Sequence, residues 1–132
     1  MLYLRPYKKD DARTIISWCE DESVFRKWTA DRYDSYPITE SDMNYKYFDC
    51  NGDCAENDNF YPMTACDESR IVGHFILRYI GGHRDILRIG FVIIDDKKRG
   101  HITVIKLWAF KMSSQTEKKY VNFLVKSGES LN

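Results

Sequence analysis

The sequence predicts an α+β protein in which helices near the amino terminus flank a mixed, mostly antiparallel sheet. Two patterns lead to this class. Apolar residues recur at helical spacing within residues 11–49, whereas three short apolar runs separated by turn sequences occupy residues 60–94. The length of 132 residues suits one domain, and 43% hydrophobic with 30% charged residues is typical of a folded globular chain.

The first half of the chain carries a strand signal followed by helix signals. Residues 2–6 alternate and end at a proline, which predicts a short first strand. Asp11 lies where an amphipathic helix begins, and a carboxylate there favours the positive end of the helix dipole. A second short helix is expected at 23–28 and a third at 40–49, where Thr39 is suited to cap the amino end.

Strand signals dominate the next part of the chain. Strands are expected at 60–66, 71–80 and 86–94, joined by turns of hairpin length. The last of these is nearly all apolar towards its end, which is typical of a central strand buried on both faces. The patterns then weaken: residues 102–110 are compatible with a strand or a buried helix, and residues 116–126 with a short helix.

The charge balance excludes some classes of protein. There are 20 basic and 20 acidic residues, whereas proteins that coat nucleic acid or acidic membranes carry a basic excess. No apolar run approaches the roughly 20 residues of a membrane span. Residues 1–100 hold 15 basic and 18 acidic residues, but residues 101–132 hold five Lys and two Glu. We expect no nucleic-acid or membrane partner, and we note that the composition changes near residue 100.

The cysteines indicate a reducing compartment. The start of the chain has no secretory pattern, so the four cysteines are expected to be free thiols in a cytoplasmic protein. Cys50 and Cys54 are close in sequence, but a zinc site needs two further ligands and none follows at a suitable spacing. We expect no metal site.

The first hundred residues resemble the GNAT superfamily of N-acetyltransferases, most of all the branch that includes ribosomal-protein N-terminal acetyltransferases. The resemblance rests on four segments in order, LRPYKKDDARTIISW, WTADRYDSYPIT, NFYPMTACDESRIVGHFILRY and ILRIGFVIIDDKKRG. It implies a GNAT-like sheet with flanking helices. It also implies transfer of an acetyl group from acetyl-CoA to the primary amine of a small molecule or peptide.

The resemblance places the acetyl-CoA site on the last of these segments. Phe91, Val92 and Ile93 would offer backbone groups to the pantetheine and to the thioester carbonyl. An amide N–H aimed at the developing oxyanion lowers the barrier to attack by the amine. The family then holds the pyrophosphate on a glycine-rich loop that opens a helix, and Arg99 and Gly100 begin that pattern.

That glycine-rich pattern is interrupted in this chain. Ile102 and Val104 stand where the family has its later glycines, and β-branched side chains hinder the approach of a phosphate to the backbone. The interruption predicts weak acetyl-CoA binding and an impaired transferase.

The acceptor pocket is expected in the loop after the second helix. There the resemblance points to Asp31, Arg32, Tyr33 and Tyr36 as substrate contacts, and the alternative is a solvated turn. His74 could act as a general base, although a histidine within a strand is more often a packed residue. No catalytic acid or base is assigned from the sequence.

The chain divides into a GNAT-like portion, 1–100, and an atypical tail, 101–132. The family's cofactor helix and the strand that follows it are not recognisable in the tail. One hypothesis is that the tail is a frame-shifted remnant after an internal deletion, and the alternative is a genuine divergent tail. Sequencing the coding DNA tests this, because the hypothesis fails if the alternate frame cannot encode the family's late helix.

A second hypothesis for function follows from the missing strand. Without it, the strand at 86–94 would expose an edge, and exposed edges pair with other chains. The chain would then be a catalytically inactive GNAT fragment that acts as a strand-pairing homodimer or interaction module.

Overall fold

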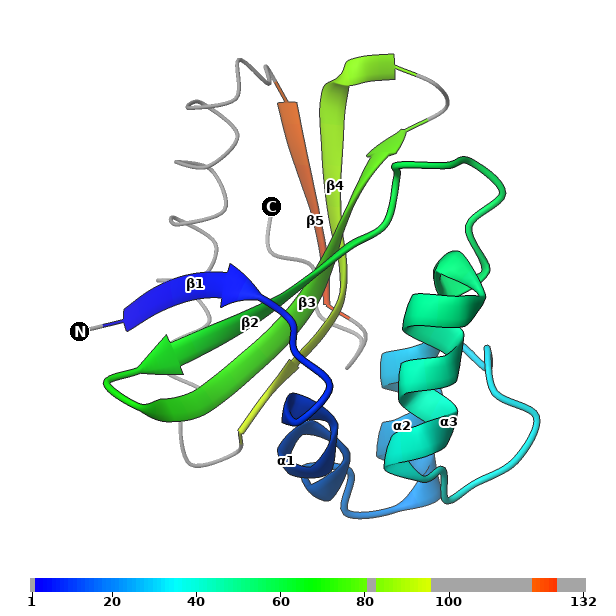
Figure 1. Ribbon diagram of the computed structural model, residues 1–132, viewed down its shortest axis with the longest axis vertical. Helices are drawn as coiled ribbons and strands as arrows, with labels where there is room; N and C mark the ends of the chain where they lie inside the picture. Colours follow the sequence, from blue (N-terminus) through cyan, green and yellow to red (C-terminus); the bar gives the residue numbers. More distant parts are fainter. Residues whose placement is uncertain (1, 81–82, 96–119, 126–132) are drawn as a thin grey trace.

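The computed structural model of the chain describes residues 2–80, 83–95 and 120–125, and it confirms the expected α+β class. The elements in chain order are β1 (Leu2–Pro6), α1 (Asp11–Ser17), α2 (Glu22–Thr29), α3 (Glu40–Asn44), β2 (Tyr61–Asp67), β3 (Arg70–Ile80), β4 (His83–Ile94) and β5 (Tyr120–Val125). The three helices gather on one side of the sheet (Figure 1).

The strands form one sheet in the order β1-β2-β3-β4-β5. Neighbours are antiparallel from β1 to β4, and the hairpin-length turns predict this for β2, β3 and β4. The pairing of β4 with β5 is parallel, so the sheet is mixed. In Figure 1, β5 lies alongside β4, far along the chain from it.

β5 corrects two expectations from the sequence. The short helix expected at 116–126 is wrong, because Tyr120–Val125 is a strand that pairs from Ile86 of β4 onward. The expected open edge of β4 is therefore wrong as well, since β4 has a neighbour on each side. The segment YVNFLV is rich in residues that favour strands, but its parallel pairing with a distant strand has no local signal. The strand or helix expected at 102–110 lies outside the described residues.

The expected helix starts are confirmed, and α2 and α3 each begin with a side-chain cap. The side chain of Asp21 accepts from the Val24 N–H at 2.9 Å where α2 begins. Thr39 and Asp42 form a reciprocal capping box at the start of α3. The helix expected at 40–49 changes character halfway, because α3 continues directly into one wider, π-helical segment at Tyr45–Asp49.

Hydrophobic clusters lie on both faces of the sheet. The buried residues of the cluster on the helix side are Tyr7, Ala12, Ile15, Phe25, Trp28, Ile38, Met43, Tyr47, Ile76 and Ile93. The cluster on the other face consists of Met63, Ala65, Val72, Phe75, Leu77, Ile89, Val92 and Ile94. β4 contributes to both, which confirms the expectation that its apolar end is buried on two faces.

A buried ion pair joins the first strand to the first helix and to the sheet. The Asp11 carboxylate accepts two hydrogen bonds from the Arg5 guanidinium, at 2.8 and 2.9 Å. It also accepts from the Lys8 N–H and from the Thr64 hydroxyl, each at 2.8 Å. Burial raises the pKa of the Asp11 carboxyl, but these hydrogen bonds outweigh burial and hold it below its ordinary value.

Replacing Asp11 by Asn should destabilise the protein by about 3 kcal/mol at neutral pH, because Arg5 loses its buried partner. The stabilisation by the carboxylate is full above its unfolded pKa near 4 and is lost as the pH falls through the lower folded value. Urea unfolding at several pH values measures both effects. The control is Asp10→Asn at the exposed neighbouring position, and equal losses in the two variants would contradict this account.

Candidate functional site

The centre of the candidate site is a bulge in β4. Between β3 and β4 the register moves from Ile76–Gly90 to His74–Ile93, so β4 holds one extra residue. A matching shift occurs against β5 between Ile89 and Val92. Phe91 lies in this interval with a φ of +54°. Bulges of this kind bend a strand and turn backbone groups out of the regular ladder, and they are frequent beside active sites.

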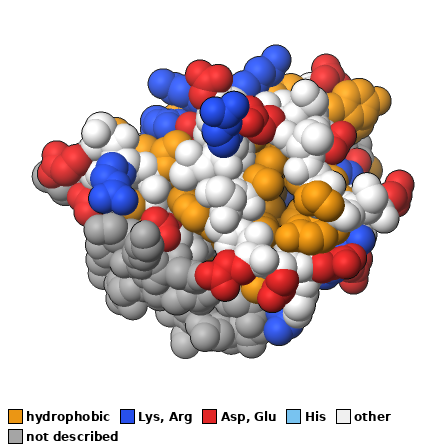
Figure 2. All heavy atoms as spheres, turned by 90° about the horizontal axis from the view of Figure 1, so that it is seen from below, with side chains coloured by type: hydrophobic (Ala, Val, Ile, Leu, Met, Phe, Trp, Pro, Cys, Tyr) orange, Lys and Arg blue, Asp and Glu red, His pale blue; other side chains and the backbone are white. Residues whose placement is uncertain are grey.

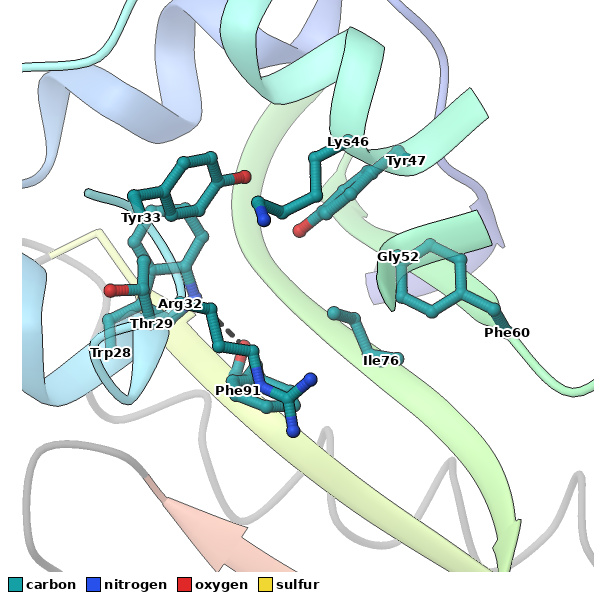
Figure 3. A pocket seen from close by; sticks show the side chains of 10 residues that line it. All are labelled: Trp28, Thr29, Arg32, Tyr33, Lys46, Tyr47, Gly52, Phe60, Ile76 and Phe91. Atoms are coloured by element: carbon teal, nitrogen blue, oxygen red, sulfur yellow. Dashed lines mark hydrogen bonds between the residues drawn. The ribbon is translucent and has the colours of Figure 1, made fainter. Parts of the chain in front are cut away.

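The bulge is anchored from the helix layer. The indole N–H of Trp28, on α2, donates to the Phe91 carbonyl oxygen at 2.9 Å (Figure 3). A left-handed backbone costs an aromatic residue about 1–2 kcal/mol, so contacts of this kind must hold Phe91 in place. Trp28 is itself only 3% exposed, and this burial makes it a rigid support.

A narrow, mostly apolar pocket opens beside the bulge, and we call it the apolar pocket. Its volume is about 30 Å³. Its lining consists of Trp28, Thr29, Arg32, Tyr33, Lys46, Tyr47, Gly52, Phe60, Ile76 and Phe91. Figure 3 shows these side chains converging from α2, the loop after it, the π-helical segment and the sheet. The space suits a few atoms of a substrate rather than a whole one.

Two cations lie along this pocket. The Lys46 ammonium is bound by the Asp53 carboxylate and lies 4.7 Å from the centre of the Tyr33 ring. The Arg32 guanidinium lies 5.2 Å from the centre of the Phe91 ring. Burial, followed by nearby carboxylates, raises the pKa of the Tyr33 hydroxyl well above its ordinary value, so Tyr33 stays protonated. The pocket therefore combines an aromatic wall with positive charge.

A second, larger cavity adjoins the apolar pocket on the helix side of the sheet, and we call it the arginine cavity. It encloses about 300 Å³. Its lining consists of Ala30, Arg32, Glu56, Asn59, Ile76, Arg78, Tyr79, Ile80, Arg88, Gly90 and Phe91. Arg32, Ile76 and Phe91 belong to both linings, so the two spaces meet at the bulge.

His74 is a packed core residue rather than a group that faces either cavity. Its Nδ1 lies 2.8 Å from the Met63 carbonyl oxygen, which can only accept, so Nδ1 carries the hydrogen. Nε2 lies 2.8 Å from the Tyr47 hydroxyl and accepts from it when the ring is neutral. Burial lowers the pKa of His74 to about 4 despite the opposing hydrogen bond, which keeps the ring neutral near pH 7.

The structure separates the four acceptor-loop residues that the sequence singles out. Arg32 and Tyr33 line the apolar pocket. Tyr36 instead packs against Phe25 in the helix-side cluster, with ring centres 5.1 Å apart. Asp31 is exposed and is not part of either lining. One of its carboxylate oxygens lies 3.9 Å from Nε of Arg26, on α2.

The residues expected to hold acetyl-CoA fall in three places. Phe91 reaches the apolar pocket. Val92 and Ile93 are buried in the clusters on opposite faces of the sheet, so only their backbone could meet a ligand. Arg99 and Gly100 lie outside the described residues, as do Ile102 and Val104.

Sequence reasoning missed several residues of the pocket. Trp28, Lys46 and Phe60 lie in different segments and meet only in the folded chain. A local signal exists for another lining residue, Gly52, because the Asn51-Gly52 pair is typical of left-handed turns. Gly52 has a φ of +59°, and a Cβ at this position would collide with the Phe60 ring.

Within 2–80, 83–95 and 120–125, no group of three or more His, Cys, Asp or Glu side chains is arranged to hold a metal ion. The four cysteines are all free. No helix in these ranges is long and apolar enough to cross a membrane. On the face shown in Figure 2, acidic and basic side chains are interspersed.

Replacing Gly52 by Ala should destabilise the protein by about 1–3 kcal/mol, because the new methyl group displaces Phe60 and the backbone is left-handed. Chemical denaturation measures the loss. Gly90→Ala is the matched control, since a Cβ there meets nothing within 4 Å. A Gly52 variant as stable as the Gly90 variant would show that the Phe60 wall is not held as described.

The comparisons with known proteins point to one fold. No protein-family model and no curated protein matches the sequence. Among solved structures, a GNAT family acetyltransferase from Staphylococcus aureus is similar over 99% of this chain and 93% of that chain, with 14% identity and a TM-score of 0.63.

Two further structures are similar. A spermidine N-acetyltransferase from Vibrio cholerae, in complex with CoA and spermine, matches over 92% of this chain and 69% of that chain, with 15% identity and a TM-score of 0.69. A possible acetyltransferase from Clostridium difficile matches over 98% and 82%, with 12% identity and a TM-score of 0.63. At such identities the likeness establishes the fold, and the fold of this chain is that of GNAT acetyltransferases.

Proposed function

We propose that this protein transfers an acetyl group from acetyl-CoA to a primary amine. The observation that carries the proposal is the bulge of β4 at Phe91, which adjoins the parallel β4–β5 pair and opens into the apolar pocket. The arrangement brings backbone groups, an aromatic wall and a cavity to one point of the sheet. The fold shared with acetyltransferase structures gives the proposal its reaction class.

The bulged strand would supply the electrostatic part of catalysis. Acetyl-CoA would supply the acetyl group as a thioester, whose carbonyl oxygen gains negative charge when an amine adds to its carbon. A backbone amide near Phe91–Val92 would donate a hydrogen bond to that oxygen. Because Trp28 fixes the Phe91 carbonyl, the donor is positioned before the substrate arrives.

The apolar pocket would orient the acceptor. Its aromatic side chains exclude water from the few atoms that it encloses. Neutral amines are the nucleophiles in such a transfer, and the nearby charge of Arg32 disfavours a protonated amine at this point, whereas the charge of Lys46 is balanced by Asp53. The acceptor would therefore be held here in its reactive form, and Arg32 and Tyr33 are its proposed contacts, whereas Asp31 and Tyr36 lie outside the pocket lining.

The strand-pairing hypothesis loses its main support. It depended on an open edge at β4, and β5 occupies that edge. In the described residues the outer strands of the sheet are β1 and β5. The free thiols of all four cysteines agree with the proposed cytoplasmic location, where such groups stay reduced.

Incubating the purified chain with acetyl-CoA and a panel of small amines, and following release of the CoA thiol, tests the proposed function. Amine-dependent release together with an acetylated amine identified by mass would support the proposal. Release that does not depend on any amine would contradict it.

The residues after β4 set the expected strength of cofactor binding. Arg99 and Gly100 would begin the pyrophosphate cradle, and Ile102 and Val104 would obstruct it. The double variant Ile102→Gly, Val104→Gly should therefore bind acetyl-CoA about tenfold or more tightly than the natural chain. Calorimetric titration measures both affinities. Micromolar binding by the natural chain, or no gain in the double variant, would contradict this reading of the loop.

A further inference from the structure

The lining of the arginine cavity holds more positive than negative charge. Arg78 and Arg88 stand directly opposite each other across β3 and β4, and Arg32 joins them in the same lining. Like charges directly opposite in a sheet destabilise it. Glu56 is the single carboxylate of the lining, so the cavity carries a net charge of two positive units.

The three arginines make few contacts that would neutralise them. Arg78 donates to the Cys54 sulfur at 3.2 Å, and Arg32 lies over the Phe91 ring. Arg88 is exposed. Among the described residues, no carboxylate lies within ion-pairing distance of any of the three; the ion pairs of the described chain involve other cations. The guanidinium groups therefore keep donors available for a bound anion.

The position of the cavity distinguishes it from the proposed pyrophosphate cradle. Arg88 precedes Phe91 by three residues on β4, whereas Arg99 follows Phe91 by eight. A strand rises about 3.3 Å per residue, so the backbone of Arg88 lies about 10 Å from the bulge, towards the amino end of β4. The arginine cavity meets the apolar pocket, where the acceptor amine would lie, at the residues that the two linings share.

We propose that the arginine cavity binds an anionic group of the acceptor, so that the substrate is a small amine carrying a carboxylate or a phosphonate. This inference rests on the proposed acetyl transfer and names the substrate class for that site. Its amine would lie at Phe91, and its anion would lie among the guanidinium groups of the cavity. A volume of about 300 Å³ matches the lower end of small-molecule sites.

The same charges make a polyamine a poor acceptor. A second ammonium group would have to enter a cavity lined by three arginines and one carboxylate. The acceptor class inferred here therefore differs from the spermine bound in the similar Vibrio cholerae structure.

A matched pair of acceptors tests the inference. 4-Aminobutyrate and 1,4-diaminobutane have the same four-carbon chain and differ in the group opposite the reacting amine. We expect kcat/KM to be at least tenfold higher for 4-aminobutyrate. The same measurement with 3-aminopropylphosphonate shows whether the cavity prefers a carboxylate or a phosphonate. A preference for 1,4-diaminobutane would overturn the inference while leaving acetyl transfer established.

Arg88→Gln tests the site itself, with Arg70→Gln as its control. Arg70 is an exposed arginine at the other end of β3 and is not part of the cavity lining. The Arg88 variant should raise KM for 4-aminobutyrate about tenfold to a hundredfold, with little change for 1,4-diaminobutane. It should also raise the Tm, because one of two opposed charges is removed. A lower Tm with an unchanged KM would overturn the inference.

A binding measurement separates this inference from the proposed function. Millimolar 4-aminobutyrate or inorganic phosphate should raise the Tm of the natural chain, and the shift should shrink in Arg88→Gln but not in Arg70→Gln. If such a shift occurs but no acetyl transfer is detected, the proposed function is contradicted and the anion site is still supported. The absence of a shift, or an equal shift in both variants, would overturn the anion site.

Discussion

The site depends on one constraint, the extra residue in β4 that places Phe91 out of register with both neighbouring strands. The bulge is costly by itself, since Phe91 adopts a left-handed backbone in the middle of a sheet. The hydrogen bond from Trp28 and the packing of α2 hold it. The two cavities meet at this residue, so the proposed chemistry and the proposed specificity both depend on the same backbone irregularity.

The surrounding polar core keeps the helix layer in place against the sheet. Asp11 joins α1 to β1 and β2 through a buried ion pair and a threonine hydroxyl. His74 joins β3 to the Tyr47 hydroxyl and to β2. Both groups are almost fully buried and satisfied, which makes them positioning elements rather than reactive ones. Trp28 and Lys46 can therefore line a defined space although they come from distant segments.

Local patterns predicted most of the described fold. The first strand, the three helices and the antiparallel strands lie within a few residues of where periodicity, caps and turns placed them. β5 was missed because parallel pairing with a distant strand leaves no short-range signal. The lining of the candidate site is predictable only in part: the sequence points to Arg32, Tyr33 and Phe91, but Trp28 and Lys46 become neighbours only through folding. The charge of the arginine cavity likewise depends on the register of β3 with β4, which composition cannot show.

The central claim is that the anchored bulge at Phe91 is the centre of acetyl transfer. The most direct test is the kinetics of acetyl transfer in Trp28→Phe, which keeps an aromatic ring but removes the donor to the Phe91 carbonyl. Trp18→Phe, a half-buried tryptophan outside both cavities, is the control. Our account predicts that kcat falls about tenfold or more in the Trp28 variant and little in the control. An unchanged kcat in a folded Trp28 variant would contradict it.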